Sequence, residues 1–173
     1  MNTLKNIYIL IIVLLVNTSA FATKYYVNVE TGKDINNGTS IETPWKSLKK
    51  VSTKNFKPGD QILLASGQEF FGFLKLNNQS GKKSKPIVIS SYPNNNNNKN
   101  PIINAKGFLN GILLNNCSHI KIEGLTVTAN GGNKPNWQKK GMRCGVLVTT
   151  SKAGVYQNIT LENLEVKDIF YEN

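Results

Sequence analysis

The sequence predicts an all-β chain that folds as a parallel β-solenoid, because one segment repeats the order of short strands found in another. The first copy opens with Gly111-Ile-Leu-Leu-Asn-Asn and the second with Gly145-Val-Leu-Val-Thr-Thr. The later blocks, His119-Ile-Lys-Ile-Glu-Gly-Leu-Thr-Val127 and Asn158-Ile-Thr-Leu-Glu-Asn-Leu-Glu-Val166, also correspond. A unit of three strands cannot bury its apolar face alone, whereas stacking on a neighbour buries it. A β-sandwich has similar short strands, but repetition in the same order favours the solenoid.

Residues 1–22 have the features of a secretory signal peptide. Lys5 supplies the positive charge, Ile7 to Val16 form an apolar run, and Ala20-Phe21-Ala22 is a cleavage signal. The apolar run is short for a membrane span, so an uncleaved anchor is the weaker alternative. We therefore expect a secreted protein, either extracellular, periplasmic or at the cell surface, with no membrane segment after cleavage.

The segment 23–60 is expected to form a strand and a short helix that caps one end of the solenoid. An open solenoid end exposes core and strand edges and must be covered. Thr43 and Pro44 fit the N-cap and the first position of a helix. Trp45, Leu48 and Val51 would form its apolar stripe. An ordinary surface helix would use the same residues.

Residues 61–173 are expected to form about three solenoid coils. Alternating or apolar runs recur between turns at 61–65, 69–76, 86–92 and 101–104, before the repeated blocks begin. No cap is evident in the sequence after Val166-Lys-Asp-Ile-Phe-Tyr171, so this region is expected to be incomplete.

The net charge of +11 favours anionic partners. For an exported chain an acidic polysaccharide fits better than nucleic acid or a membrane surface, although lysines that serve only solubility explain the charge equally well. Cys117 and Cys144 permit a disulfide. The repeat places them opposite Ser151 and Asn110, which favours two free thiols.

The N-terminal motifs resemble those of exported right-handed parallel β-helix proteins of the pectate-lyase-like superfamily. The residues concerned are Tyr25-Tyr-Val-Asn, Gly32-Lys-Asp-Ile-Asn-Asn-Gly-Thr39, Pro44-Trp-Lys-Ser-Leu48, Lys57-Pro-Gly-Asp60 and Ile62-Leu-Leu64. The resemblance implies a right-handed parallel β-helix that acts on polysaccharide. It further implies a lyase that performs β-elimination with a Lys or Arg base, with Ca²⁺ as a cofactor by resemblance alone.

The resemblance also implies that a hydrolase of this fold needs clustered Asp residues, whereas Asp34, Asp60 and Asp168 are far apart in the sequence. The expected function is therefore the N-terminal part of a secreted lyase for acidic polysaccharide whose catalytic coils are missing here. The alternative is a non-catalytic carbohydrate-binding or surface-structural module.

The connection from Thr128 to Cys144 is the candidate binding site, since long loops between solenoid strands gather on one face. Trp137 offers a flat surface for a sugar ring, and Arg143 offers charge for a carboxylate. Lys139 and Lys140 are the plausible bases. The alternative is a basic loop whose tryptophan packs on the solenoid.

Other polar residues are expected to be structural. His119 aligns with Asn158 at a turn, where imidazole and amide can make similar hydrogen bonds. Asn115 and Asn116 are expected to form polar stacks between coils. Glu123 aligns with Glu162, which predicts a solvent-facing position. The residues Asp34, Asn36 and Asn37 fit turn capping better than a calcium loop.

Overall fold

The computed structural model describes residues 22–94, 98–129 and 143–169, which leaves the predicted signal peptide outside the described residues except for Ala22. This part is all-β and contains a single helix, α2 (Leu48–Ser52). No helix among these residues is long and apolar enough to cross a membrane. The strands are β1 (Lys24–Val27), β2 (Gln61–Ala65), β3 (Glu69–Phe71), β4 (Leu74–Asn77), β5 (Ile87–Tyr92), β6 (Ile102–Asn104), β7 (Asn110–Asn115), β8 (Ile120–Glu123), β9 (Thr126–Thr128), β10 (Cys144–Thr149), β11 (Ile159–Glu162) and β12 (Glu165–Lys167).

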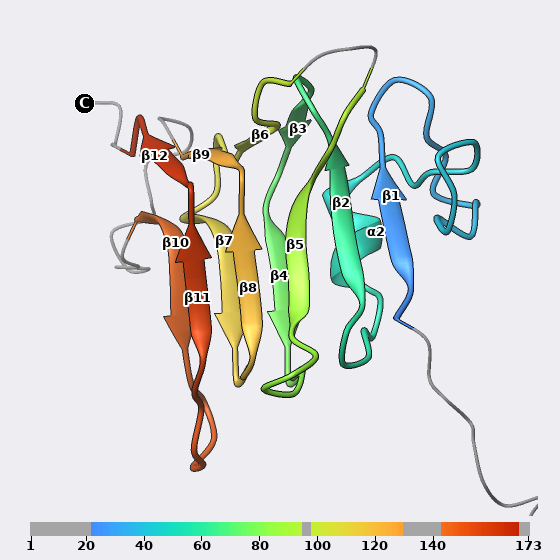
Figure 1. Cartoon of the computed structure of the whole chain (residues 1–173). Helices are drawn as coiled ribbons and strands as arrows, with labels where there is room; N and C mark the ends of the chain where they lie inside the picture. Colours follow the sequence, from blue (N-terminus) through green and yellow to red (C-terminus); the bar gives the residue numbers. More distant parts are fainter. Residues whose placement is uncertain (1–21, 95–97, 130–142, 170–173) are drawn as a thin grey trace, which may run out of the picture.

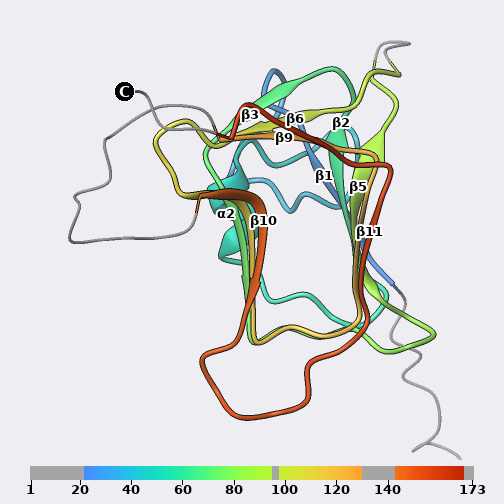
Figure 2. The same cartoon turned by 90° about the vertical axis from the view of Figure 1, so that its left-hand side faces the viewer.

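The strands form three parallel sheets whose strands stack along one axis (Figure 1). The largest, here called sheet A, has the order β1-β2-β5-β8-β11. The others have the orders β3-β6-β9-β12 and β4-β7-β10. Viewed along the axis, the sheets form three sides around a common interior, and loops close the fourth (Figure 2). The chain passes through the sheets in a fixed order, which is consistent with the predicted β-solenoid.

Residues in register on successive strands fill the interior. Ile62 pairs with Ile89, which pairs in turn with Ile122, and all three side chains are fully buried. The predicted repeat is also in register, because Val146 pairs with Ile112 and Cys144 with Asn110. The sequence repeat therefore corresponds to physical stacking.

The helix begins later than the sequence predicts. Its N-cap is Ser47, whose side chain accepts a hydrogen bond from the Lys50 amide, and not Thr43. Trp45 instead forms a parallel bridge with Val27 and stacks its ring on Tyr25, with 4.9 Å between ring centroids. These tertiary contacts hold the chain extended through Trp45 and delay the first helical turn.

Both cysteines are free, as the repeat alignment favours. Cys117 is buried, and burial raises the pKa of its thiol despite hydrogen bonds to backbone groups. Cys144 is half-buried and accepts a hydrogen bond from the side chain of Asn110.

Candidate functional site

Of the four predicted site residues, only Arg143 falls within the described part of the chain. Trp137, Lys139 and Lys140 lie outside the described residues. Arg143 directly precedes β10, and its Nη1 donates to the carbonyl oxygens of Phe108 (3.2 Å) and Ala129 (2.8 Å). Its guanidinium therefore joins the β6–β7 turn to the residue that follows β9. Ala129 and Arg143, near the two ends of the predicted binding loop, thus lie at one corner of the solenoid.

A hollow of about 410 Å³ lies close to this corner, between α2 and the turns that follow β3 and β6. We call it the corner groove. It is lined by Ser47, Leu48, Lys49, Ser52, Phe71, Gly72, Phe73, Lys106 and Phe108. A second, smaller hollow shares Phe73 and Phe108 with it, so these two rings belong to both depressions.

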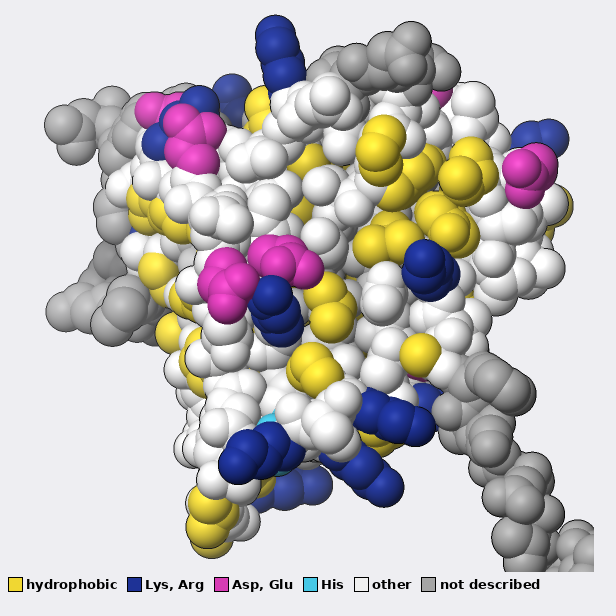
Figure 3. All heavy atoms as spheres, viewed as in Figure 1, with side chains coloured by type: hydrophobic (Ala, Val, Ile, Leu, Met, Phe, Trp, Pro, Cys, Tyr) yellow, Lys and Arg dark blue, Asp and Glu magenta, His cyan; other side chains and the backbone are white. Residues whose placement is uncertain are grey.

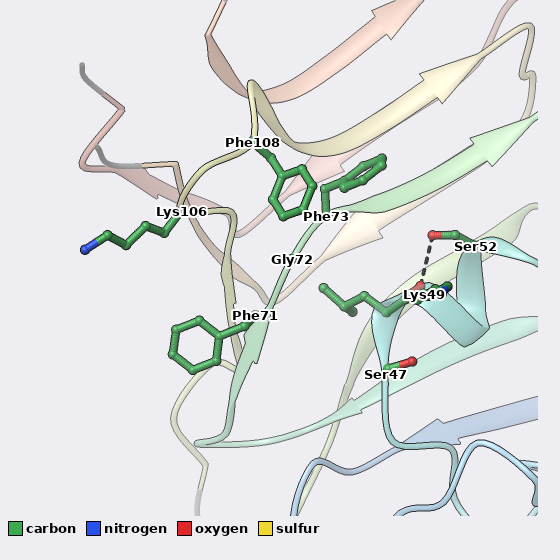
Figure 4. A pocket seen from close by; sticks show the side chains of 9 residues that line it. Ser47, Lys49, Ser52, Phe71, Gly72, Phe73, Lys106 and Phe108 are labelled. Atoms are coloured by element: carbon green, nitrogen blue, oxygen red, sulfur yellow. Dashed lines mark hydrogen bonds between the residues drawn. The ribbon is translucent and has the colours of Figure 1, made fainter. Parts of the chain in front are cut away.

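Three phenylalanine rings dominate the groove (Figure 4). The rings of Phe73 and Phe108 face each other with centroids 4.9 Å apart and planes tilted by 42°. Phe71, at the end of β3, leaves 70% of its surface exposed, and Phe108 leaves 43%. Exposed aromatic rings gathered in a concave site are typical of a binding surface.

Gly72 forms the turn between Phe71 and Phe73. Its φ of +112° lies in a region that other residues rarely adopt. Outside Phe71 and Phe73, a Cβ built on this glycine would meet no atom within 4 Å, so the backbone conformation and not crowding favours glycine here. The Gly72 amide is held by the carbonyl oxygen of Asn104 at 2.9 Å.

The polar groups of the groove determine what it can bind. Ser52 Oγ donates to the Leu48 carbonyl and accepts from the Lys75 amide, and Ser47 Oγ donates to Asp34. Lys49 and Lys106 supply positive charge at the rim, where Lys106 points outward (Figure 4). The groove thus offers flat apolar surfaces with a few donors, and none of its lining residues is a carboxylate.

Where the structure resolves a pKa shift for a carboxyl group, the pKa is lowered. Burial acts to raise the pKa of Asp34, but hydrogen bonds from the Ser47 side chain and from the Lys46 and Ser47 amides outweigh it. The pKa of Glu165 is lowered by hydrogen bonds from Lys167 and Thr126. A glycosidase acid needs a raised pKa, so neither group has the property of such an acid.

Asp34 is a turn residue, as the sequence favours, and its bonds fix the start of α2. Within the described segments, no group of three or more His, Cys, Asp or Glu residues could hold a metal ion.

The other predicted polar stacks are present. His119 and Asn158 both adopt positive φ, and their side chains are 3.0 Å apart. Glu123 and Glu162 lie in register on the solvent face, where Lys121 Nζ bridges them at 2.8 and 2.9 Å. Hydrogen bonds to Glu123 and then Glu162 raise the pKa of Lys121, so the lysine offsets the like charges.

The sequence does not predict the aromatic groove. It predicts one extended run over residues 69–76, whereas the chain turns at Gly72 between β3 and β4. A usable signal was present, since a glycine between two phenylalanines allows a positive-φ turn that leaves the rings exposed. Phe108 could not be assigned to the same site, because only the stacking of the two turns brings it to Phe73.

Comparison with known proteins finds relatives among lacto-N-biosidases. The lacto-N-biosidase of Bifidobacterium longum subsp. longum is 28% identical over 88% of this chain. Two crystal structures of the GH136 lacto-N-biosidase from Eubacterium ramulus, native and selenomethionine derivative, match with a TM-score of 0.74 and 30% identity over 85% of this chain. No family model matches the sequence.

This chain spans only a small part of these relatives. It covers 12% of the Bifidobacterium protein and 27% of the solved Eubacterium chain. A rhamnogalacturonan lyase also aligns, but at 22% identity and a TM-score of 0.45 it is too distant to indicate function.

These findings correct three predictions. The assignment to the pectate-lyase-like superfamily is wrong, since the similar proteins are GH136 lacto-N-biosidases. The predicted β-elimination lyase is wrong for the same reason, and the non-catalytic alternative gains no support. A hydrolase was also wrongly disfavoured, because clustered Asp residues need not lie within a chain that spans only a fraction of its relatives.

Proposed function

We propose that this chain is a section of a glycoside hydrolase of the GH136 lacto-N-biosidase type, which acts on a neutral oligosaccharide. The observation that carries the proposal is the TM-score of 0.74 together with 30% identity over 85% of the chain. The sequence predicts a carbohydrate partner, and the proposal keeps it. The proposal drops the predicted acidic polysaccharide, because the similar proteins are lacto-N-biosidases. The many lysines suit solubility, as at Lys82, Lys83 and Lys85, which are exposed on one loop.

The proposal includes the handedness of the solenoid, its number of coils and its N-terminal cap. We expect a right-handed β-helix with about three coils over residues 61–173 and an N-terminal cap over residues 23–60. Contacts of α2 with β4 support the cap, because the Ser52 hydroxyl accepts a hydrogen bond from the Lys75 amide at 2.9 Å. The Gln79 side chain likewise accepts from the Phe56 amide at 2.9 Å. Residues 1–22 would direct secretion and be removed.

The corner groove is the proposed sugar contact. One face of many pyranose rings carries mainly C–H groups, and burying it against an aromatic ring removes apolar area from water. The loop that ends at Arg143 would contribute to the same surface, with Trp137 stacking on a sugar and Lys139 or Lys140 donating to its hydroxyl groups. Arg143 serves this surface by holding the backbone at Phe108 and Ala129 in place.

Hydrolysis of a glycosidic bond needs a carboxylic acid and a second carboxylate at a defined separation. We propose that these groups belong to the part of the relatives' length that this chain does not span. The chain would then supply scaffold and sugar contacts, and no bond cleavage by itself.

The test is a titration of the isotopically labelled chain with lacto-N-biose, followed by amide NMR. We expect shift changes at Phe71, Phe73 and Phe108. Phe108→Ala should weaken binding about tenfold, because one ring of an aromatic site contributes on the order of 1–2 kcal/mol. The chain should release no aryl group from an aryl lacto-N-bioside.

Val155→Ala is the matched control, since it removes an exposed apolar side chain, 84% accessible, away from the groove. It should bind like the parent chain. The sugar contact would be refuted if the chemical shifts of the groove residues did not change. It would also be refuted if the Phe108→Ala and Val155→Ala variants bound with equal affinity.

A further inference from the structure

The outer face of sheet A carries a separate hollow of about 650 Å³, which we call the sheet hollow. Its lining comes from β1, β2, β5 and β8 together with Ile41 and Pro93, and none of it is shared with the corner groove. The lining residues are Lys24, Tyr26, Ile41, Gln61, Leu63, Val88, Ser90, Ser91, Tyr92, Pro93, Lys121 and Glu123. Hydrophobic side chains gather on this face over β1, β2 and β5, and an acidic pair with a lysine lies beside them (Figure 3).

Parallel register arranges this surface in rows. Tyr26, Leu63 and Ser90 lie side by side on three adjacent strands. Gln61, Val88 and Lys121 form the next row. Neighbouring strands are about 4.8 Å apart, which is close to the length of one sugar unit. A chain of sugars that crosses the strands would therefore meet one strand after another.

The Tyr26 ring is held in a fixed orientation. It packs edge to face with Tyr92 at 5.2 Å and an interplanar angle of 89°. Tyr92 is 6% exposed, and Nδ2 of the Asn28 side chain donates to its hydroxyl at 3.4 Å. A rigid ring loses little conformational freedom on binding, which favours affinity.

Polar groups surround the apolar floor. Across the residues that the structure describes, Gln61, Ser90 and Ser91 make no side-chain hydrogen bond. The Glu123 carboxylate is bonded to Lys121 at 2.8 Å, and a carboxylate keeps further lone pairs for other donors. The hollow therefore combines flat apolar surface with groups that can bind hydroxyls.

The position of the hollow argues against a peptide partner. A peptide strand adds to a sheet at an unpaired edge, but β2 and β5 are each paired on both sides. A docked helix needs a continuous apolar groove, which Lys24, Gln61 and Glu123 interrupt.

We propose that the sheet hollow binds a neutral oligosaccharide across strands β1 to β8, with Tyr26 and Leu63 under one sugar and Ser90 and Glu123 bonded to the next. The site lies apart from the corner groove and does not depend on the hydrolase assignment. Its volume lies within the range of ligand pockets, about 300–1,000 Å³.

The test is binding of two neutral tetrasaccharides, cellotetraose and one that ends in lacto-N-biose, measured by amide NMR and calorimetry. At least one should shift the amides of Tyr26, Leu63 and Ser90. Tyr26→Ala should weaken binding at least about tenfold, and Ser90→Ala about threefold to tenfold, the range for a lost hydrogen bond.

Thr160→Ala is the control for Ser90→Ala, because Thr160 faces outward on the same sheet next to Lys121 but outside the hollow. Tyr156→Ala controls for the loss of a tyrosine. Spectra of each variant establish that it is folded, and Ser90→Ala keeps the test valid if Tyr26→Ala does not fold.

The proposal is overturned if neither tetrasaccharide shifts the hollow residues, or if Ser90→Ala binds as tightly as Thr160→Ala. Shifts confined to Phe71, Phe73 and Phe108 would overturn the sheet hollow and leave the corner groove standing. Shifts confined to Tyr26, Leu63 and Ser90 would support the sheet hollow and overturn the corner groove.

Discussion

Glycines at the start of each repeat allow two sheets to approach closely. Gly111 of β7 lies against Val127 of β9, and Gly145 of β10 lies against Val166 of β12. A Cβ on Gly111 would collide with Val127 Cγ1, and one on Gly145 would lie 2.5 Å from Val166 Cγ1. The repeat therefore preserves a steric requirement between a glycine and a valine of the same layer.

Gly111→Ala should lower the free energy of unfolding by about 1–3 kcal/mol, the usual cost of overpacking a core. Val127 is fully buried and cannot move aside, whereas Val166 is 49% exposed and can. Gly145→Ala should therefore cost less than Gly111→Ala. Urea denaturation of both variants measures the difference, and an equal or reversed order would contradict this account.

Single residues were predictable where the repeat fixed their neighbours. The pairing of Cys144 with Asn110 and of His119 with Asn158 followed from alignment of the two copies. The start of the helix could not be predicted in this way. Trp45 stacks on Tyr25 and bridges to Val27, two residues distant in the sequence, and these contacts keep it out of the helix. Local helix signals at Thr43 could not reveal that competition.

At the scale of elements, a ladder of side chains joins the turns after β4, β7 and β10. Asn116 Nδ2 donates to Asn78 Oδ1 (2.9 Å) and to Ser151 Oγ (3.0 Å), and Asn116 Oδ1 accepts from the Ser151 amide (2.8 Å). Asn116 is 5% exposed and has a φ of 54°. The buried side-chain amide of Asn116 is thus hydrogen-bonded, and asparagine also tolerates left-handed backbone geometry.

Two substitutions separate these roles. Asn116→Gly keeps the backbone geometry and loses the ladder, so we expect a loss of about 1–3 kcal/mol in unfolding free energy. Asn116→Ala should lose about 1–2 kcal/mol more, the cost of left-handed geometry for a residue with a Cβ. Equal stability of the two variants in thermal and urea denaturation would show that backbone geometry contributes nothing.

The elements of the repeat were predictable because strands, turns and register all follow one sequence pattern. The corner groove was not, since it needs α2 and two turns that are distant in the sequence. Phe73 and Phe108 meet only after β4 and β7 have paired. A site whose residues are brought together only when solenoid coils stack leaves no motif in the sequence.

At the scale of the whole molecule, burial falls sharply in the last layer. Leu114 and Ile122 are fully buried, yet their register partners Val148 and Leu161 are 45% and 48% exposed. Val166, the partner of the buried Val127, is 49% exposed. Nothing within the described ranges covers the outer side of β10, β11 and β12. Exposed apolar side chains beside unpaired strand edges favour association.

We therefore expect the chain to self-associate as its concentration rises, with this layer as the contact. The double variant Val148→Lys and Leu161→Lys should be monomeric, because lysines on an edge layer resist pairing. It should unfold within about 0.5 kcal/mol of the parent chain, as exposed positions tolerate substitution. The matched double variant Leu114→Lys and Ile122→Lys should not fold, since it places two charges in the core. Analytical ultracentrifugation over a concentration series measures association, and a parent chain that stays monomeric throughout, or a Val148/Leu161 variant that still associates, would refute this contact.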